Sequence, residues 1–223
     1  EEIAEKACEL IEVDYDVHPW TIEIDDAIKP DAPILHDFIK FNGKPSNIAG
    51  TLEHKKGNIE EGFKDADIII EKEFETAAVH QGYLETHACL VSVSPDDRTT
   101  IWSSSQGQFM VRAMTSFITG IPQSSIRAIP AEIGGGFGGK TIVYLEPVAT
   151  ILSKKSGRPV KMVMTREEVM RASGPTSGSK SKVKIGAKND GKITAAQGTF
   201  YLQAGAFPGA PIRGAAGCCF CLL

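Results

Sequence analysis

The sequence has few cysteines, no excess of positive charge and no long hydrophobic run, and each absence removes a class of function. The five cysteines are odd in number and unevenly spaced, which argues against a disulfide framework. The net charge at pH 7 is −4, so nothing favours binding to nucleic acid. No apolar stretch is long enough to span a membrane. Glu1 and Glu2 stand where a signal peptide would carry basic residues, so we expect a cytoplasmic protein.

The cysteines that are present fall into two groups. Cys8 and Cys89 lie in apolar segments, and we expect both to be buried free thiols. Cys218, Cys219 and Cys221 crowd the end of the sequence without the paired C-x-x-C spacing of a zinc site, so their role stays open. We expect no residue of this chain to ligate a metal.

Glycine, by contrast, is concentrated in one place. The stretch Ile133-Gly-Gly-Gly-Phe-Gly-Gly-Lys140 has five glycines in six residues, interrupted only by Phe137. Glycine allows positive φ and close approach of a ligand, and consecutive N–H groups can bind an anion. An apolar run follows and predicts a helix over 142–156, so we expect an anion site where the loop enters the helix. The alternative is a tight turn or a closely packed strand end.

The same stretch matches two nucleotide-binding patterns by letter. Residues 134–141 satisfy G-x-x-x-x-G-K-[ST], and G-x-G-x-x-G also fits. However, Phe137 lies in the middle of the loop, no Walker-type aspartate follows an obvious strand, and no βαβ unit precedes it. A P-loop-like nucleotide-binding protein therefore remains only an alternative.

The first 62 residues differ in pattern from the rest. Residues 1–9 have helical spacing, and the alternation over 11–17 predicts a half-buried strand. Residues 18–62 show little periodicity and predict a long connection. We therefore expect one domain to end within 1–62 and a second to occupy 63–223.

The second part predicts an α+β protein with mixed or antiparallel sheets and packed helices. Strands are expected at 66–79, 88–93, 99–104, 126–130, 159–164 (as a buried strand), 180–187 and 192–203. Helices are expected at 107–119, ending at Gly120, at 142–156, ending at Gly157, and after Thr165.

Two groups of polar residues are candidates for a site. His80, Glu85 and His87 lie close in sequence, but strand spacing would place them on both faces, so we expect Glu85 to be a buried, hydrogen-bonded carboxylate rather than a metal ligand. Gln106 ends the run Trp102-Ser-Ser-Ser-Gln106 between a strand and a helix. Its amide offers a donor and an acceptor, which suits an oxo or carbonyl ligand.

Four motifs occur in a characteristic order. They are Gln81-Gly-Tyr-Leu-Glu-Thr-His87, Trp102-Ser-Ser-Ser-Gln106, Gly134-Gly-Gly-Phe-Gly-Gly-Lys140, and Gly157-Arg-Pro-Val160 with Thr165-Arg-Glu-Glu168. The series resembles the molybdenum-binding subunit of the xanthine dehydrogenase and aldehyde oxidase family over residues 5–208. The resemblance implies that 1–62 holds the tail of a hammerhead-like α/β domain plus a linker, and that 63–223 is the first part of the molybdopterin-binding domain.

The resemblance also implies roles for individual residues. Gln106 matches the family glutamine that hydrogen-bonds an oxo ligand of molybdenum. Gly136, Phe137 and Gly138 match the loop whose backbone approaches the pterin and the ligands of the metal. Thr141 is a departure, because purine-oxidising members carry a glutamate that contacts substrate at this position.

The resemblance places the catalytic glutamate beyond residue 223, so no catalytic base is identified. The expected protein is an N-terminal fragment or truncated homologue of a molybdenum hydroxylase, inactive by itself. Iron–sulfur clusters and FAD would belong to partner subunits or domains, because the chain lacks a ferredoxin-like cysteine series. The alternatives are a non-catalytic structural or assembly domain and the P-loop-like protein.

Overall fold

The computed structural model describes residues 2–206, and the chain divides into two compact units between Ala49 and Gly50. The first unit contains helices α1 (Glu2–Glu9) and α2 (Ile24–Ala27) and strands β1 (Lys40–Phe41) and β2 (Lys44–Pro45). The expected boundary after residue 62 and the hammerhead assignment remain predictions.

The first unit contains a short hairpin and a set of hydrogen bonds made by one asparagine side chain. Strands β1 and β2 form a hairpin whose turn residues Asn42 and Gly43 have φ of 50° and 78°, as the tight turn requires. The side chain of Asn47 accepts a hydrogen bond from Leu35 N and donates to the carbonyl oxygens of Ala27 and Pro33. The part-buried Asn47 amide thus connects three points of a unit in which Ile24 is the only buried residue among those described.

Three predictions for this region are wrong. Residues 11–17 form no strand and are exposed, because the alternating pattern lacks a partner strand among the described residues. Residues 18–62 are not one structureless connection, since α2, β1, β2 and the start of α3 (Ile59–Lys64) lie within them. Cys8 is exposed, because no residue of α1 is buried.

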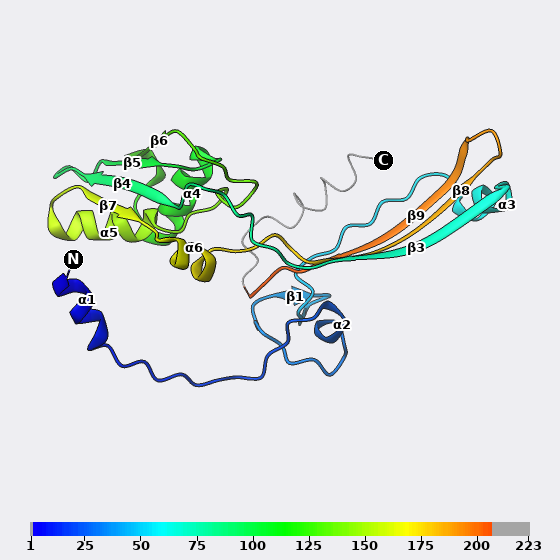
Figure 1. The fold of residues 1–223 in the computed structure, drawn as a ribbon, viewed down its shortest axis with the longest axis horizontal. Coiled ribbons are helices and arrows are strands. Elements are labelled where there is room, and N and C mark those ends of the chain that lie inside the picture. The colour runs from blue at the N-terminus through cyan, green and yellow to red at the C-terminus, as the bar shows by residue number, and fades with distance from the viewer. Residues whose placement is uncertain (1, 207–223) are drawn as a thin grey trace. The chain divides into compact units, whose positions relative to one another are not determined.

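The second unit contains a mixed four-stranded sheet in the order β6-β5-β4-β7 (Figure 1). Strand β4 (Ala88–Val93) pairs antiparallel with β5 (Thr99–Ser103) and with β7 (Val160–Val163). Strand β6 (Ile126–Pro130) pairs parallel with β5. The expected hairpin over 88–104 is confirmed.

Helices α4 (Gln108–Thr119) and α5 (Glu146–Ser156) contact each other and the four-stranded sheet. Their apolar side chains and those of the strands form the main core: Cys89, Val91, Ile101, Val111, Ile121, Ile126 and Ala149. Gly120 and Gly157 end the two helices with φ of 73° and 65°, as predicted. The short helix η1 (Gln123–Ser125) leads into β6.

Two expectations for this unit need correction. The helix expected from residue 142 begins at Glu146, where Pro147 fixes the first turn, and Val143 and Leu145 instead pack against the core from an irregular segment. Strand β7 alternates between half-buried and exposed residues because it is the edge of the sheet, so it is not a buried strand.

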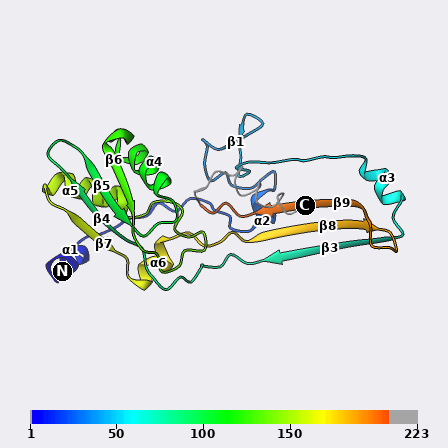
Figure 2. The ribbon, with the colours of Figure 1, turned by 90° about the horizontal axis from the view of Figure 1, so that it is seen from above.

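A separate antiparallel sheet has the order β3-β8-β9, formed by β3 (Ile68–Thr76), β8 (Ser179–Ala187) and β9 (Ile193–Leu202). Figure 2 shows the three strands side by side over their length. The hairpin expected around Asn189-Asp-Gly191 is confirmed. On one face, glutamates 71, 73 and 75 of β3 lie opposite lysines 184, 182 and 180 of β8.

The mixed and antiparallel sheets with packed helices confirm the α+β prediction. Within residues 2–206, every helix is too short or too polar to cross a lipid bilayer.

We expect replacement of Thr165 by alanine to destabilise the protein by about 1 kcal/mol. Thr165 precedes α6 (Arg166–Ala172), and its Oγ1 accepts a hydrogen bond from Glu168 N at 3.2 Å, while Glu168 Oε2 accepts one from Thr165 N at 2.6 Å. Thr165→Ser keeps the hydroxyl and should retain the wild-type melting temperature. An equal loss in both variants would contradict a capping role.

Candidate cofactor-binding site

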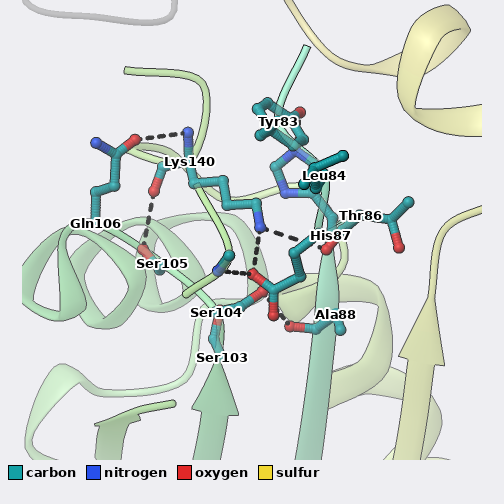
Figure 3. Close-up of polar contacts among 12 residues, drawn as sticks. Tyr83, Leu84, Thr86, His87, Ala88, Ser103, Ser104, Ser105, Gln106 and Lys140 are labelled. Atoms are coloured by element: carbon teal, nitrogen blue, oxygen red, sulfur yellow. Dashed lines mark hydrogen bonds and ion pairs between the residues drawn. The ribbon is translucent and has the colours of Figure 1, made fainter. Parts of the chain in front are cut away.

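Three segments that are distant in sequence meet beside the end of β5 (Figure 3). They are the turn from β5 into α4, which carries Gln106, the segment 80–87 before β4, and the glycine-rich loop 134–140. Backbone N–H groups of the loop donate to the side chains of Glu85 and Gln106, and the Lys140 side chain pairs with Glu85. Gln106 and the glycine-rich loop, which the sequence analysis assigned to one site, are therefore in direct contact.

Gln106 is held in a single orientation by the loop. Its N–H donates to Lys140 O at 2.9 Å, and its Oε1 accepts from Gly138 N and Lys140 N, both at 3.1 Å. Two N–H donors on Oε1 identify that atom as the oxygen, so Nε2 must be the opposite, donating end of the amide. Among residues 2–206, Nε2 donates to no acceptor, and the residue is exposed. A ligand can therefore receive this donor.

Close packing explains why the loop needs glycine. A Cβ on Gly136 would lie 2.5 Å from Gln106 Oε1, and one on Gly134 would lie 2.6 Å from the Cβ of Glu85. Gly135 and Gly138 have φ of 95° and 89°, which other residues rarely adopt. The glycines thus let the loop lie directly against Gln106 and Glu85.

Phe137 lies at the tip of the loop. Its φ is 50°, the residue is 72% exposed, and Gly139 N closes the turn by donating to Gly136 O at 2.7 Å. Phe137 and Gly138 therefore occupy a tight, exposed turn between β6 and α5, as expected.

The loop does not lead into a helix N-terminus, so that part of the anion-site prediction is wrong. Helix α5 begins six residues after Lys140, at Glu146. The carboxylate of Glu146 already accepts from Ser103 Oγ at 2.5 Å and from Tyr144 N at 3.1 Å. In the loop itself, the N–H groups of 135–137 have no acceptor among the described residues, whereas those of 134 and 138–140 do. Because Gly136 is buried, the donors open to a ligand are the N–H groups of Gly135 and Phe137 at the turn.

Lys140 is buried, with 1% of its side chain exposed. Its Nζ donates to Glu85 Oε2 at 2.6 Å and to Thr86 O at 3.4 Å, and lies 5.0 Å from the centre of the Tyr83 ring. A P-loop lysine must instead reach the phosphates of a nucleotide. The P-loop alternative is therefore wrong.

Glu85 connects to both ends of the loop. Its Oε2 accepts from Gly134 N at 2.8 Å as well as from Lys140 Nζ. Burial raises the pKa of Glu85, but the hydrogen bonds from Lys140 and Gly134 and the lysine charge outweigh this and hold it below its ordinary value. The hydrogen-bonded carboxylate is confirmed, although its side chain is 34% exposed and precedes β4 rather than lying between strands.

The two histidines take part in a hydrogen-bonded chain with Tyr83 and Ser173. His80 Nδ1 accepts from Gly82 N, so its Nε2 donates to Ser173 Oγ at 3.0 Å. Ser173 Oγ donates to a helix carbonyl, which leaves it to accept from Tyr83 OH at 3.2 Å. Tyr83 OH in turn accepts from His87 Nε2 at 2.7 Å. Among residues 2–206, no three His, Cys, Asp or Glu side chains could hold a metal ion.

Acidification should destabilise the protein through His87. Burial, reinforced by the charge of Lys140, lowers the pKa of His87 to about 4, against about 6.5 when unfolded. Between these values the unfolded chain binds more protons, so stability falls as pH falls, by up to about 1.4 kcal/mol per pH unit. Because the pKa of Glu85 is lowered in the folded protein, Glu85 adds to the loss of stability only once the pH falls below the ordinary pKa of a glutamate. Melting temperatures from pH 7 to 4.5 should fall less steeply in His87→Gln, and equal slopes would contradict the assignment.

Sequence reasoning missed Tyr83, Ser173 and the burial of Lys140. Tyr83 is 1% exposed and forms a second core cluster with Met164 and Val169. The four-residue spacing of Tyr83 and His87 could have suggested their contact only in a helix, and these residues lie in an irregular segment. Ser173 lies 90 residues from Tyr83, and nothing in the sequence joins them.

Comparison with known proteins identifies the family and the fold. The sequence pattern of the family described as the molybdopterin cofactor-binding domain matches residues 40–220. The chain belongs to this family. The match includes Gln106, Lys140 and the whole glycine-rich loop, so the resemblance to the xanthine dehydrogenase and aldehyde oxidase family is confirmed.

Named relatives support the same assignment. The chain is 32% identical to a probable hypoxanthine oxidase of Escherichia coli, over 93% of this chain and 25% of the relative. It is 34% identical to a carbon monoxide dehydrogenase large chain of Hydrogenophaga pseudoflava, over 92% and 27%. The chain therefore spans about a quarter of the length of the relatives it matches.

Solved structures share the fold. A copper- and molybdenum-containing carbon monoxide dehydrogenase aligns with a TM-score of 0.73 and 30% identity, over 89% of this chain and 26% of that one. Quinoline 2-oxidoreductase from Pseudomonas putida aligns with a TM-score of 0.76 and 22% identity, over 89% and 25%. The second likeness supports the fold alone.

The described residues fit the cofactor of this family. A molybdopterin carries anionic oxygens and needs hydrogen-bond donors that approach closely. The outward Nε2 of Gln106 and the N–H groups of Gly135 and Phe137 supply such donors, and the glycines let the loop that carries them lie directly against Gln106.

Proposed function

We propose that this chain is the first part of the molybdenum-binding subunit of a hydroxylase, and that Gln106, Gly136, Phe137 and Gly138 form one wall of its cofactor site. The observation that carries this proposal is the orientation of Gln106. Its oxygen is occupied by two loop N–H groups, so its NH₂ group is directed away from the loop. The loop therefore leaves an exposed donor at a fixed position, where it can bind an oxygen of the cofactor.

In the complete enzyme, the molybdenum cofactor supplies the redox chemistry that hydroxylates a carbon next to nitrogen or oxygen. The residues of this chain orient that cofactor by donating hydrogen bonds from the Gln106 amide and the backbone of the loop. Glu85 is not a candidate for the base that accepts the substrate proton, because the hydrogen bonds from Lys140 and Gly134 N to its Oε2 hold its pKa below the ordinary value and so make it a weaker base. The base belongs to the remainder of the subunit.

The substrate class is a heterocycle or an aldehyde. Thr141 stands where purine-oxidising members carry a glutamate, and its Oγ1 donates to Gly138 O at 3.0 Å. This position therefore offers no carboxylate, which disfavours a xanthine-like purine. Electrons leave to iron–sulfur clusters and FAD on partner subunits or domains in the cytoplasm.

The isolated 223-residue chain should retain no molybdenum cofactor after purification, because it encodes only one wall of the site. Metal analysis by mass spectrometry and a fluorescence assay for released pterin measure this directly. Stoichiometric molybdenum in the isolated chain would contradict the proposal that the site is incomplete.

The function itself is tested on the complete subunit with its partners. We expect about one molybdenum per subunit and reduction of an electron-accepting dye with a heterocycle or an aldehyde. A subunit that folds and assembles but contains neither molybdenum nor pterin would favour the alternative of a structural or assembly domain.

A further inference from the structure

Lys140 is in contact with all three segments of the site. Its backbone N–H donates to Gln106 Oε1, and its carbonyl oxygen accepts from Gln106 N at 2.9 Å and from Ser105 Oγ at 3.1 Å. Its side chain extends the other way, to Glu85 and Thr86 O. Figure 3 shows the chain of contacts from Gln106 through Lys140 to the segment before β4.

Glu85 completes this arrangement by holding the other end of the loop. The same oxygen, Oε2, accepts from Lys140 Nζ at 2.6 Å and from Gly134 N at 2.8 Å. The ion pair therefore fixes the first and last residues of the glycine-rich stretch against one carboxylate. Between them lie residues that have no side chain, or only the exposed Phe137, to hold the loop in place.

Burial of the Lys140 side chain is energetically unfavourable. Removing an ammonium group from water is unfavourable, and an apolar side chain of similar volume often gives equal or greater stability. An ion pair at this position is therefore poorly explained by stability alone. Fixing one arrangement of neighbouring groups is the better-attested use of such pairs.

We propose that Glu85 and Lys140 are positioning residues that fix the orientation of the Gln106 amide. By setting the position of the loop backbone, the pair aims Gly138 N and Lys140 N at Gln106 Oε1 and so directs Nε2 outward. Without the pair, the two N–H groups separate from Oε1 and the amide rotates between its two orientations. The effect on turnover depends on the proposed function, whereas the effect on the loop does not.

The test uses the complete subunit with its partners and the variants Glu85→Gln, Lys140→Met and the double variant. The neutral substitutes approximate the shapes of the two side chains, and the double variant leaves no unpaired charge. Lys188→Met is the matched control, because Lys188 pairs with Asp65 at 2.8 Å on the other sheet of this unit.

The primary measurement is hydrogen exchange at the N–H groups of Gly138 and Lys140 in cofactor-free subunit. We expect exchange to be at least about tenfold faster than in the wild type in each single variant and in the double variant. The control should exchange at the wild-type rate. Melting temperature should recover in the double variant, because no buried charge is left without its partner. Recovery of the melting temperature together with wild-type exchange would show that the pair has only a structural role and would overturn the proposal.

Kinetics in the cofactor-loaded enzyme give a second measurement. We expect the double variant to lose kcat at least about tenfold with little change in KM, because substrate binding does not involve the pair. If the enzyme is not a molybdenum hydroxylase, the kinetics fail but the exchange result stands. If Lys140→Met does not fold, Glu85→Gln provides the same exchange measurement, and unchanged exchange there contradicts the proposal.

Discussion

Replacing Gly136 by alanine is expected to lower turnover of the complete enzyme about a hundredfold, while the fold is retained. The new Cβ would lie 2.5 Å from Gln106 Oε1 and 2.6 Å from its Cδ, so the amide must move. That movement breaks its bonds to Gly138 N and Lys140 N and turns Nε2 away from the cofactor. A loss of about 2.7 kcal/mol of transition-state stabilisation corresponds to this factor.

The cost to stability should be small by comparison. Gly136 does not have a positive φ, so alanine is compatible with its backbone, and the displaced group is the end of a flexible side chain. Gly174→Ala is the matched control, because its Cβ would meet only Tyr144 Oη at 3.7 Å, an ordinary contact. Turnover per bound molybdenum and melting temperature should be measured for both. Full turnover in Gly136→Ala would mean that the position of Gln106 is unimportant.

The second large effect is expected from Gln106 itself. Gln106→Ala removes the donor to the cofactor, and a hydrogen bond to a charged or strongly polar acceptor contributes roughly 1.5–3 kcal/mol. Turnover should therefore fall about tenfold to a hundredfold if the bond strengthens in the transition state. The melting temperature should also fall modestly, because Gly138 N and Lys140 N lose the acceptor that Gln106 Oε1 provides.

The Gln106→Glu variant distinguishes the role of the amide oxygen, which accepts from the loop, from that of the NH₂ group, which donates outward. A carboxylate can still accept from Gly138 N and Lys140 N, so the loop should keep its structure, but the outward donor becomes an acceptor. Turnover should fall at least as far as in the alanine variant. Gln123→Ala, on an exposed glutamine in η1, should have no effect. Wild-type turnover with full molybdenum content in Gln106→Glu would contradict the donor role.

Local signals predicted much of the fold. The glycines at 120 and 157 end their helices, and the turn residues 189–191 close the β8–β9 hairpin, because each depends only on its own backbone conformation. The alternation over 11–17 failed because a strand also needs a partner, which a local pattern cannot reveal. The helix expected from residue 142 failed because Val143 and Leu145 are apolar for packing rather than for helical periodicity.

The site was predictable in its parts but not in its contacts. The position of Gln106 at a strand end and the glycine content of the loop were visible in the sequence, and the family resemblance joined them. In the sequence, Lys140 resembles the end of a phosphate loop, and its partner Glu85 lies 55 residues away. Burial of Lys140 beside its partner depends on the tertiary fold, so neither it nor the fixed orientation of the Gln106 amide could be inferred from the sequence.

The most direct test of the account is hydrogen exchange in the loop of the complete subunit, with and without its cofactor. The N–H groups of Gly135 and Phe137 have no acceptor among the described residues, and neither residue is buried, so they should exchange rapidly in the cofactor-free protein. Bound molybdopterin should slow their exchange at least about tenfold, while the β4–β5 turn at 94–98 stays unchanged. Unchanged exchange at Gly135 and Phe137 in protein with stoichiometric molybdenum and pterin would show that the cofactor lies elsewhere and would contradict the account.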